Sequence, residues 1–176
     1  MKKIIFNEKS PEFNKFMIER FPFLMPRNVW TGKIVEDYDY SWTLFNEIPR
    51  GWRKAFGMDF MEELREACIE ADFLDELMIL QIKEKFGTLR FYTNPIPRNI
   101  DHIIQKYEDL SAWICIECGA PAKWISKDWI CPWCDDCCKE SRNTRPSAFD
   151  TIDTWYGEYE PIGDSKWDMI LKTSNH

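Results

Sequence analysis

Six of the seven cysteines in this 176-residue chain lie between positions 115 and 138. Two of them belong to the knuckle Cys115-Ile116-Glu117-Cys118-Gly119, in which the glycine permits a tight turn. Zn²⁺ binds four ligands in a tetrahedron, and two Cys-x-x-Cys turns supply four sulfur ligands from short stretches of backbone. Such clustering is typical of a metal site, whereas a disulfide framework would staple the whole chain. The sequence therefore predicts one structural zinc site.

The second pair of ligands can be chosen in two ways. Cys131-Pro132-Trp133-Cys134 and Cys134-Asp135-Asp136-Cys137 both have the required spacing, and they share one sulfur. The pair Cys134 and Cys137 leaves fifteen residues between the knuckles, inside the usual range for a zinc ribbon, whereas Cys131 and Cys134 leave twelve. With four sulfur ligands the metal would have no open position for water, so it is expected to stabilise and not to catalyse.

The charge of the chain argues against general nucleic-acid binding. The net charge is −7, with −3 on residues 1–110 and −4 on residues 111–176, and a protein that grips phosphate backbones normally shows a basic field. No stretch approaches the roughly 18 apolar residues that span a bilayer. The first residues are interrupted by Asn7, Glu8 and Lys9 before they reach the length of a signal peptide. We therefore expect a cytoplasmic protein.

The apolar periodicity predicts an α+β fold, with helices packed on a small antiparallel sheet. Helices are expected from Pro11 to before Pro22, from Asp59 to about Asp72, and from Ile100 to about Trp113. Residues 22–50 read as loop with short strands. A β-hairpin is expected at 77–93, because Phe86-Gly87 separates two extended runs. Cys68, in the second helix, is expected to pack in the core.

This pattern divides the chain into three parts. The α+β body spans 1–113, the zinc-ribbon module spans 114–140, and an acidic, aromatic tail spans 141–176. The tail is rich in turn residues but retains large aromatic side chains, so we expect it to pack back on the body.

The hairpin gathers basic side chains on one face. With Phe86-Gly87 as the loop, the pairs are Lys85 with Thr88, Lys83 with Arg90, and Gln81 with Tyr92. The other face carries Leu80, Ile82, Leu89 and Phe91, which should point inward.

Lys83 opposite Arg90 is a destabilising pair of like charges, so a negative group should lie nearby. It can come from the acids of the 59–72 helix or of the tail. It can also be an anionic ligand such as a nucleotide, bound by Lys83, Lys85 and Arg90 while Tyr92 stacks on the base. The basic and aromatic residues Trp52 and Arg53 could line the same pocket.

The chain offers few groups for catalysis. Its two histidines, His102 and His176, fit no Ser-His-Asp or Cys-His arrangement, and no glycine-rich phosphate loop is present. The spacing singles out no pair of carboxylates, so an enzyme is possible and unsupported.

The stretch from Gln81 to Tyr92 resembles a motif of a group of small, uncharacterised phage and prophage proteins. Their pattern is a helix, a hairpin of the form Lys-Glu-Lys-Phe-Gly-x-Leu-Arg-Phe-Tyr, another helix, and a Cys-x-x-Cys-Gly knuckle followed by Cys-Asp-x-Cys. The resemblance covers residues 50–140. It favours Cys115, Cys118, Cys134 and Cys137 as the zinc ligands and leaves Cys131 and Cys138 as extras.

What the resemblance implies is a phage accessory protein that acts inside a bacterium, where inhibiting host defence is a common task. We therefore expect a non-enzymatic counter-defence protein that sequesters an anionic nucleotide-type ligand. Two alternatives stay open. One is an inhibitor that binds a host protein through its acidic aromatic surface, as a mimic of nucleic acid; the other is a nucleotide hydrolase.

Overall fold

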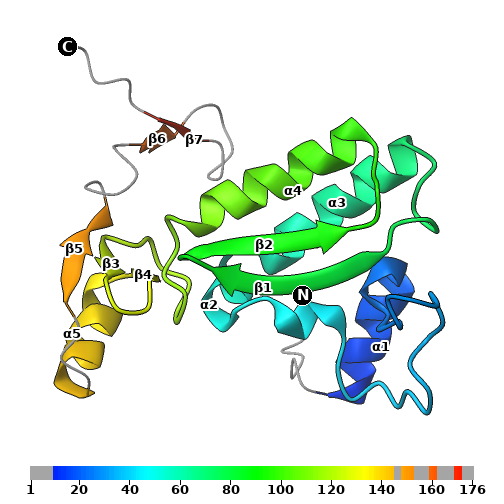
Figure 1. The fold of residues 1–176 in the computed structure, drawn as a ribbon, viewed down its shortest axis with the longest axis horizontal. Helices are drawn as coiled ribbons and strands as arrows, with labels where there is room; N and C mark the ends of the chain where they lie inside the picture. Colours follow the sequence, from blue (N-terminus) through cyan, green and yellow to red (C-terminus); the bar gives the residue numbers. More distant parts are fainter. Residues whose placement is uncertain (1–9, 145–147, 153–158, 162–168, 172–176) are drawn as a thin grey trace, which may run out of the picture.

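The structure, a computed structural model, describes residues 10–144, 148–152, 159–161 and 169–171. Its architecture is α+β, as the sequence predicts: helices pack around a two-stranded antiparallel sheet, and a cysteine-containing module with its own small sheet lies at one end of this body (Figure 1). Within these residues no helix is both long and apolar enough to cross a bilayer.

The first helix, α1 (Pro11–Arg20), begins and ends where its sequence predicts. The Ser10 side chain accepts a hydrogen bond of 3.1 Å from the backbone N–H of Phe13, which satisfies one of the free donors of the first turn. Pro22 then opens the short 3₁₀ turn η1 (Pro22–Leu24). The region 25–49 is largely irregular, with an isolated bridge between Arg27 and Ile34 and the turn η2 (Leu44–Glu47).

The second helix of the body is longer than predicted. It starts as α2 (Arg50–Trp52), continues through the π-helical turn η3 (Arg53–Gly57) and runs on as α3 (Met58–Glu70). The backbone stays in the right-handed helical region at both junctions. Only the α3 part was expected from the periodicity of its apolar residues.

The hairpin consists of β1 (Ile79–Lys85) and β2 (Thr88–Thr93), and its register near the turn matches the prediction. Lys83 lies opposite Arg90 and Lys85 opposite Thr88. Leu80 differs from its predicted inward position: the register shifts between Ile79 and Gln81, so Ile79 is buried and Leu80 is exposed. A β-bulge of this kind rotates one residue out of the alternation.

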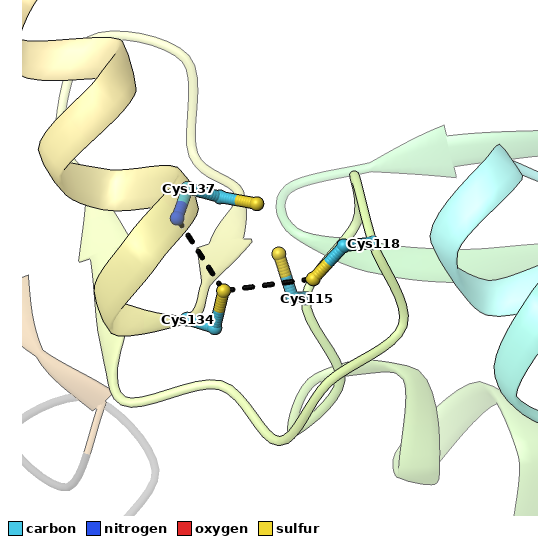
Figure 2. A group of neighbouring side chains, drawn as sticks. All are labelled: Cys115, Cys118, Cys134 and Cys137. Atoms are coloured by element: carbon cyan, nitrogen blue, oxygen red, sulfur yellow. Dashed lines mark hydrogen bonds between the residues drawn. The ribbon is translucent and has the colours of Figure 1, made fainter.

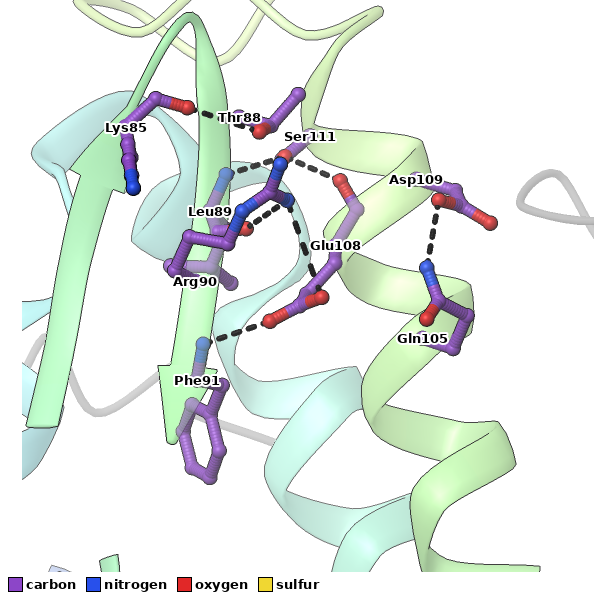
Figure 3. A network of polar contacts seen from close by, with 9 residues as sticks. All are labelled: Lys85, Thr88, Leu89, Arg90, Phe91, Gln105, Glu108, Asp109 and Ser111. Carbon is purple, nitrogen blue, oxygen red and sulfur yellow. Dashed lines mark hydrogen bonds and ion pairs between the residues drawn. The ribbon is translucent and has the colours of Figure 1, made fainter. Parts of the chain in front are cut away.

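The inner face of the hairpin and the helix α4 (Arg98–Ser111) complete the core of the body. Phe60 of α3 links the two, because its ring lies 5.1 Å from that of Phe91 and stacks at 4.6 Å on that of Tyr107. Side chains of α4 also accept hydrogen bonds from backbone N–H groups on the outer edge of β2. The N–H of Leu89 donates to Ser111 Oγ, and the N–H of Phe91 donates to Glu108 Oε1, both at 2.7 Å (Figure 3).

The C-terminal module contains a three-stranded sheet in the order β4-β3-β5. Its strands and helix are β3 (Trp124–Ser126), β4 (Pro132–Trp133), α5 (Asp135–Thr144) and β5 (Phe149–Thr151). A separate antiparallel pair, β6 (Tyr159–Pro161) and β7 (Met169–Leu171), follows.

The described part of the tail next to the module pairs with the module, and the packing of the tail on the body stays a prediction. β5 pairs with β3, and the ring of Phe149 lies edge-on to that of Trp133, so the module extends beyond residue 140 to at least residue 152. The predicted tail aromatics Trp155, Tyr156 and Trp167 lie outside the described residues.

Candidate metal centre and the adjoining surface

Four cysteine side chains converge between the knuckle and the start of α5. The Sγ atoms of Cys115, Cys118, Cys134 and Cys137 all lie within 4.8 Å of one another (Figure 2). A tetrahedral zinc ion with Zn–S bonds of about 2.3 Å requires sulfurs about 3.8 Å apart, so the four can hold such an ion with small adjustments. Cys131 and Cys138 do not belong to this group. The ambiguity of the second ligand pair is therefore resolved by position.

Local backbone geometry brings each pair of sulfurs together. In the knuckle, Gly119 has a φ of +82° and donates its N–H to the carbonyl of Cys115 at 3.0 Å, a turn that favours glycine. Cys134 precedes α5, and the N–H of Cys137 points to Cys134 Sγ at 3.5 Å. The positive end of a helix favours thiolate. Both pairs are thus placed by turns that the sequence specifies.

The electrostatics of the four sulfurs favour a cation between them. Burial raises the pKa of the Cys115 thiol and of the Cys137 thiol. Burial acts in the same direction on Cys118, but hydrogen bonds from the Ala120 N–H and from neighbouring thiols outweigh it and lower the Cys118 pKa. Thiolates this close repel one another, so all four ionise together only around a positive ion. The donor set therefore fits a metal ion that binds four thiolates.

The knuckle docks directly on the start of the second helix of the body. The Gly51 N–H donates to the carbonyl of Ile116 at 2.8 Å, and the indole Nε1 of Trp52 donates to the carbonyl of Ile114 at 2.8 Å. Gly51 has no room for a side chain: a Cβ there would lie 2.2 Å from the carbonyl oxygen of Cys115. The metal centre is thereby fastened to the body through backbone contacts.

Trp52 does not line a ligand pocket, so the prediction for this residue is wrong. Its side chain is 0% exposed and belongs to the core. The indole N–H donates a hydrogen bond to the carbonyl of Ile114, just before the knuckle. Arg53 turns inward as well. Its Nη1 donates to the carbonyls of Asn46 and Ile48 at 3.0 and 3.1 Å, so it fastens the loop before α2.

The outer face of the hairpin shows how the like charges are accommodated. The ammonium of Lys83 lies 5.1 Å from the centre of the Tyr92 ring, which is a cation–π arrangement. Arg90 Nη1 lies 3.9 Å from Glu108 Oε2 (Figure 3). Among the residues that the structure describes, the acid that pairs with Arg90 therefore comes from α4 and not from the 59–72 helix. Burial raises the pKa of Glu108, against the Phe91 N–H and the Arg90 charge, which lower it.

Beside this face lies a cleft that the sequence did not predict. It has a volume of about 260 Å³ and is lined by residues from the hairpin turn and from the loop before β4: Glu84, Lys85, Phe86, Asp128, Trp129 and Ile130. Phe86 is 67% exposed and Trp129 is 73% exposed. Glu84 connects the two segments, because its Oε1 accepts from the Gly87 N–H at 2.7 Å and its Oε2 from the Trp129 indole at 3.1 Å.

Only one sequence signal pointed to this cleft. A bulky aromatic residue stands at the first position of a tight turn where asparagine, aspartate or glycine is usual. The contribution of Trp129 has no local signal, since it depends on the module being docked against the hairpin.

Comparisons with protein-family models, with curated proteins and with solved structures find no match. The interpretation of both sites therefore rests on their geometry.

Proposed function

We propose that this chain is a non-enzymatic, zinc-stabilised protein that binds another protein through Phe86 and Trp129. The observation that carries the proposal is the pairing of these two exposed rings across one cleft, with Glu84 hydrogen-bonded to both segments. Large aromatic side chains held in place are the usual anchors of protein interfaces, because little conformational entropy is lost when they bind.

The metal has a structural role in this proposal. Four cysteine sulfurs fill the coordination sphere of Zn²⁺ and leave no position for a reacting water. The centre lies between α5 and the knuckle that is docked on Gly51 and Trp52. Zinc would thus keep the loop that carries Trp129 next to the hairpin turn.

The size of the cleft favours a protein over a small molecule. Ligand pockets usually measure about 300–1,000 Å³ and enclose most of their ligand. At about 260 Å³ the Phe86–Trp129 cleft is smaller than that range, but it suits a single side chain from a partner. The resemblance of the hairpin motif to phage and prophage proteins makes a host bacterial protein the first partner to test, and a counter-defence role the first to consider.

Site-specific photocross-linking tests this proposal. Benzoylphenylalanine is placed at position 86 of the zinc-loaded chain and, as a control, at position 30, where Trp30 is 91% exposed and outside the cleft. We expect position 86 to form an adduct with one discrete protein in bacterial lysate, and Trp129→Ala to abolish it. Absence of an adduct at position 86, or the same adducts from both positions, would contradict the proposal.

A second candidate function is capture of an anionic nucleotide on the outer face of the hairpin, with Lys83, Lys85, Arg90 and Tyr92 as its contacts. One observation favours it: among the residues that the structure describes, neither Lys83 nor Lys85 has a carboxylate partner within 4.0 Å. Calorimetry with a panel of nucleotides and cyclic nucleotides tests it. Binding that Lys83→Gln weakens would support this function, and no heat at high micromolar ligand would exclude it.

A further inference from the structure

Phe86 occupies a backbone conformation that is unfavourable for its side chain. Its φ is +53°, and the next residue, Gly87, has a φ of +80°. A bulky residue in the left-handed region costs about 1–2 kcal/mol, whereas asparagine or glycine tolerates it better. The ring does not recover this cost by packing, since it is 67% exposed. Strain retained at an exposed side chain indicates a use for that side chain outside the fold.

One carboxylate joins the hairpin turn to the indole of Trp129. Glu84 accepts a hydrogen bond from the turn beside Phe86 and another from the indole of Trp129. Hydrogen bonds to a charged acceptor are roughly twice as strong as neutral ones. The indole of Trp129 is therefore held next to the hairpin turn before any guest arrives.

The negative charge of the cleft favours a cationic guest. The cleft carries two carboxylates, Glu84 and Asp128, against the single ammonium of Lys85, and the whole chain has a net charge of −7. Aromatic faces attract cations through the ring quadrupole, most strongly at tryptophan, and arginine is the commonest partner. Anionic guests are opposed by both carboxylates.

The hairpin already shows this chemistry within the chain. The ammonium of Lys85 lies 5.4 Å from the centre of the Phe86 ring, and that of Lys83 lies 5.1 Å from the centre of Tyr92. Among the described residues, none places a cation over the ring of Trp129. The strongest π face of the cleft is thus open to a cation from outside.

We propose that the cleft between Phe86 and Trp129 binds an arginine side chain from a basic segment of the partner protein. The inference rests on the proposed function, since it names the group that the protein partner inserts. The guanidinium stacks on Trp129 and is flanked by the carboxylate of Asp128. The ammonium of Lys85, on the opposite wall of the cleft, competes with the guanidinium for the carboxylates of Glu84 and Asp128.

Titration of the isotope-labelled, zinc-loaded chain with N-acetyl-arginine methylamide tests the proposal, because the uncharged citrulline analogue has nearly the same shape. The indole signal of Trp129 is identified with Trp129→Phe among the nine tryptophans. We expect arginine to shift this signal and to bind about 2–30-fold more tightly than citrulline, the factor expected for a cation–π contact. Equal affinity for both probes, or no shift at Trp129, overturns the proposal.

Two variants sharpen the test. Asp128→Asn should reduce the preference for arginine, whereas Asp101→Asn, at another exposed aspartate outside the cleft, should not. If both variants lower arginine binding equally, the charge argument fails. Cross-linking at position 86 reports on the protein partner independently, so a retained adduct without arginine preference overturns this inference alone.

Discussion

Substituting Gly51 by alanine should weaken metal binding by the four cysteines, because Gly51 contacts the backbone of the knuckle. A methyl group at this position would lie 2.2 Å from the carbonyl oxygen of Cys115 and 2.5 Å from that of Ile116. Both are backbone atoms of the knuckle, so no flexible side chain can move aside to make room. The knuckle must shift, and the hydrogen bond from the Gly51 N–H to Ile116 is strained or lost.

The expected cost follows from three contributions. Overpacking in a tight contact costs about 1–3 kcal/mol, and loss of one buried backbone hydrogen bond costs about 0.5–1.5 kcal/mol. Alanine in a helix returns about 1 kcal/mol relative to glycine. The net destabilisation is about 0.5–3.5 kcal/mol. If it falls on the knuckle, zinc affinity drops by about 2–300-fold, because 1.4 kcal/mol corresponds to a factor of ten.

Zinc affinity is measured by competition with a chromophoric chelator, and stability by denaturant unfolding of the zinc-loaded protein. Gly32→Ala is the control: unlike Gly51, Gly32 has a positive φ, of +68°, but a Cβ there meets no atom within 4 Å. It should cost some stability through backbone strain without changing zinc affinity. Wild-type zinc affinity in Gly51→Ala would refute the inference that the contact between Gly51 and the knuckle supports zinc binding.

Three further predictions concern the turn, the buried carboxylate and the metal. Phe86→Asn should leave thermal stability unchanged or raise it, because asparagine tolerates the left-handed turn. The same variant should no longer pull down the partner protein that cross-linking identifies. A large loss of stability would show that the ring supports the fold. Burial raises the pKa of Glu108 above its ordinary 4.5, so the folded state holds that proton more tightly, and the stability of wild type relative to Glu108→Gln should fall as the pH rises above about 4.5. A relative stability that rises with pH would contradict this. Chelation of zinc should expose amides of the module to hydrogen exchange and spare α3 and α4, whose core is built from residues before the first knuckle cysteine; equal loss of protection throughout would contradict it.

Local signals were sufficient to predict most of the body. The cap at Ser10, the apolar periodicity of α3 and α4 and the Phe86-Gly87 turn each act over a few residues, and the structure places these elements where the sequence indicates. The register near the turn follows from the loop length alone. The bulge at Leu80 has no such local signal.

Features that depend on docking between distant segments could not be predicted. Trp52 stands beside Arg53 and Lys54 and reads as a surface cluster, but the knuckle more than sixty residues later buries it. The helical start at Arg50 follows a proline and includes a glycine, a sequence that reads as a turn. Both acquire their structure from the contact with the chain at Ile114 and Ile116.

The sequence left two choices for the second pair of candidate metal ligands, and the structure distinguishes them by position. Spacing left Cys131 competing with Cys137, and the helix α5, absent from the prediction, decides between them because it turns Cys137 toward the knuckle (Figure 2). Cys131 is instead buried in the module, where burial and the nearby charge of Glu84 raise its pKa to about 12. A neutral thiol in such surroundings is a packing residue.

X-ray absorption at the zinc edge tests the central claim, that Cys115, Cys118, Cys134 and Cys137 bind one structural zinc ion. The wild-type chain and Cys131→Ser should both show four sulfur ligands at about 2.3 Å. Cys137→Ser should lose one of them or lose the metal. Three sulfurs in Cys131→Ser, or four in Cys137→Ser, would contradict the assignment of this centre.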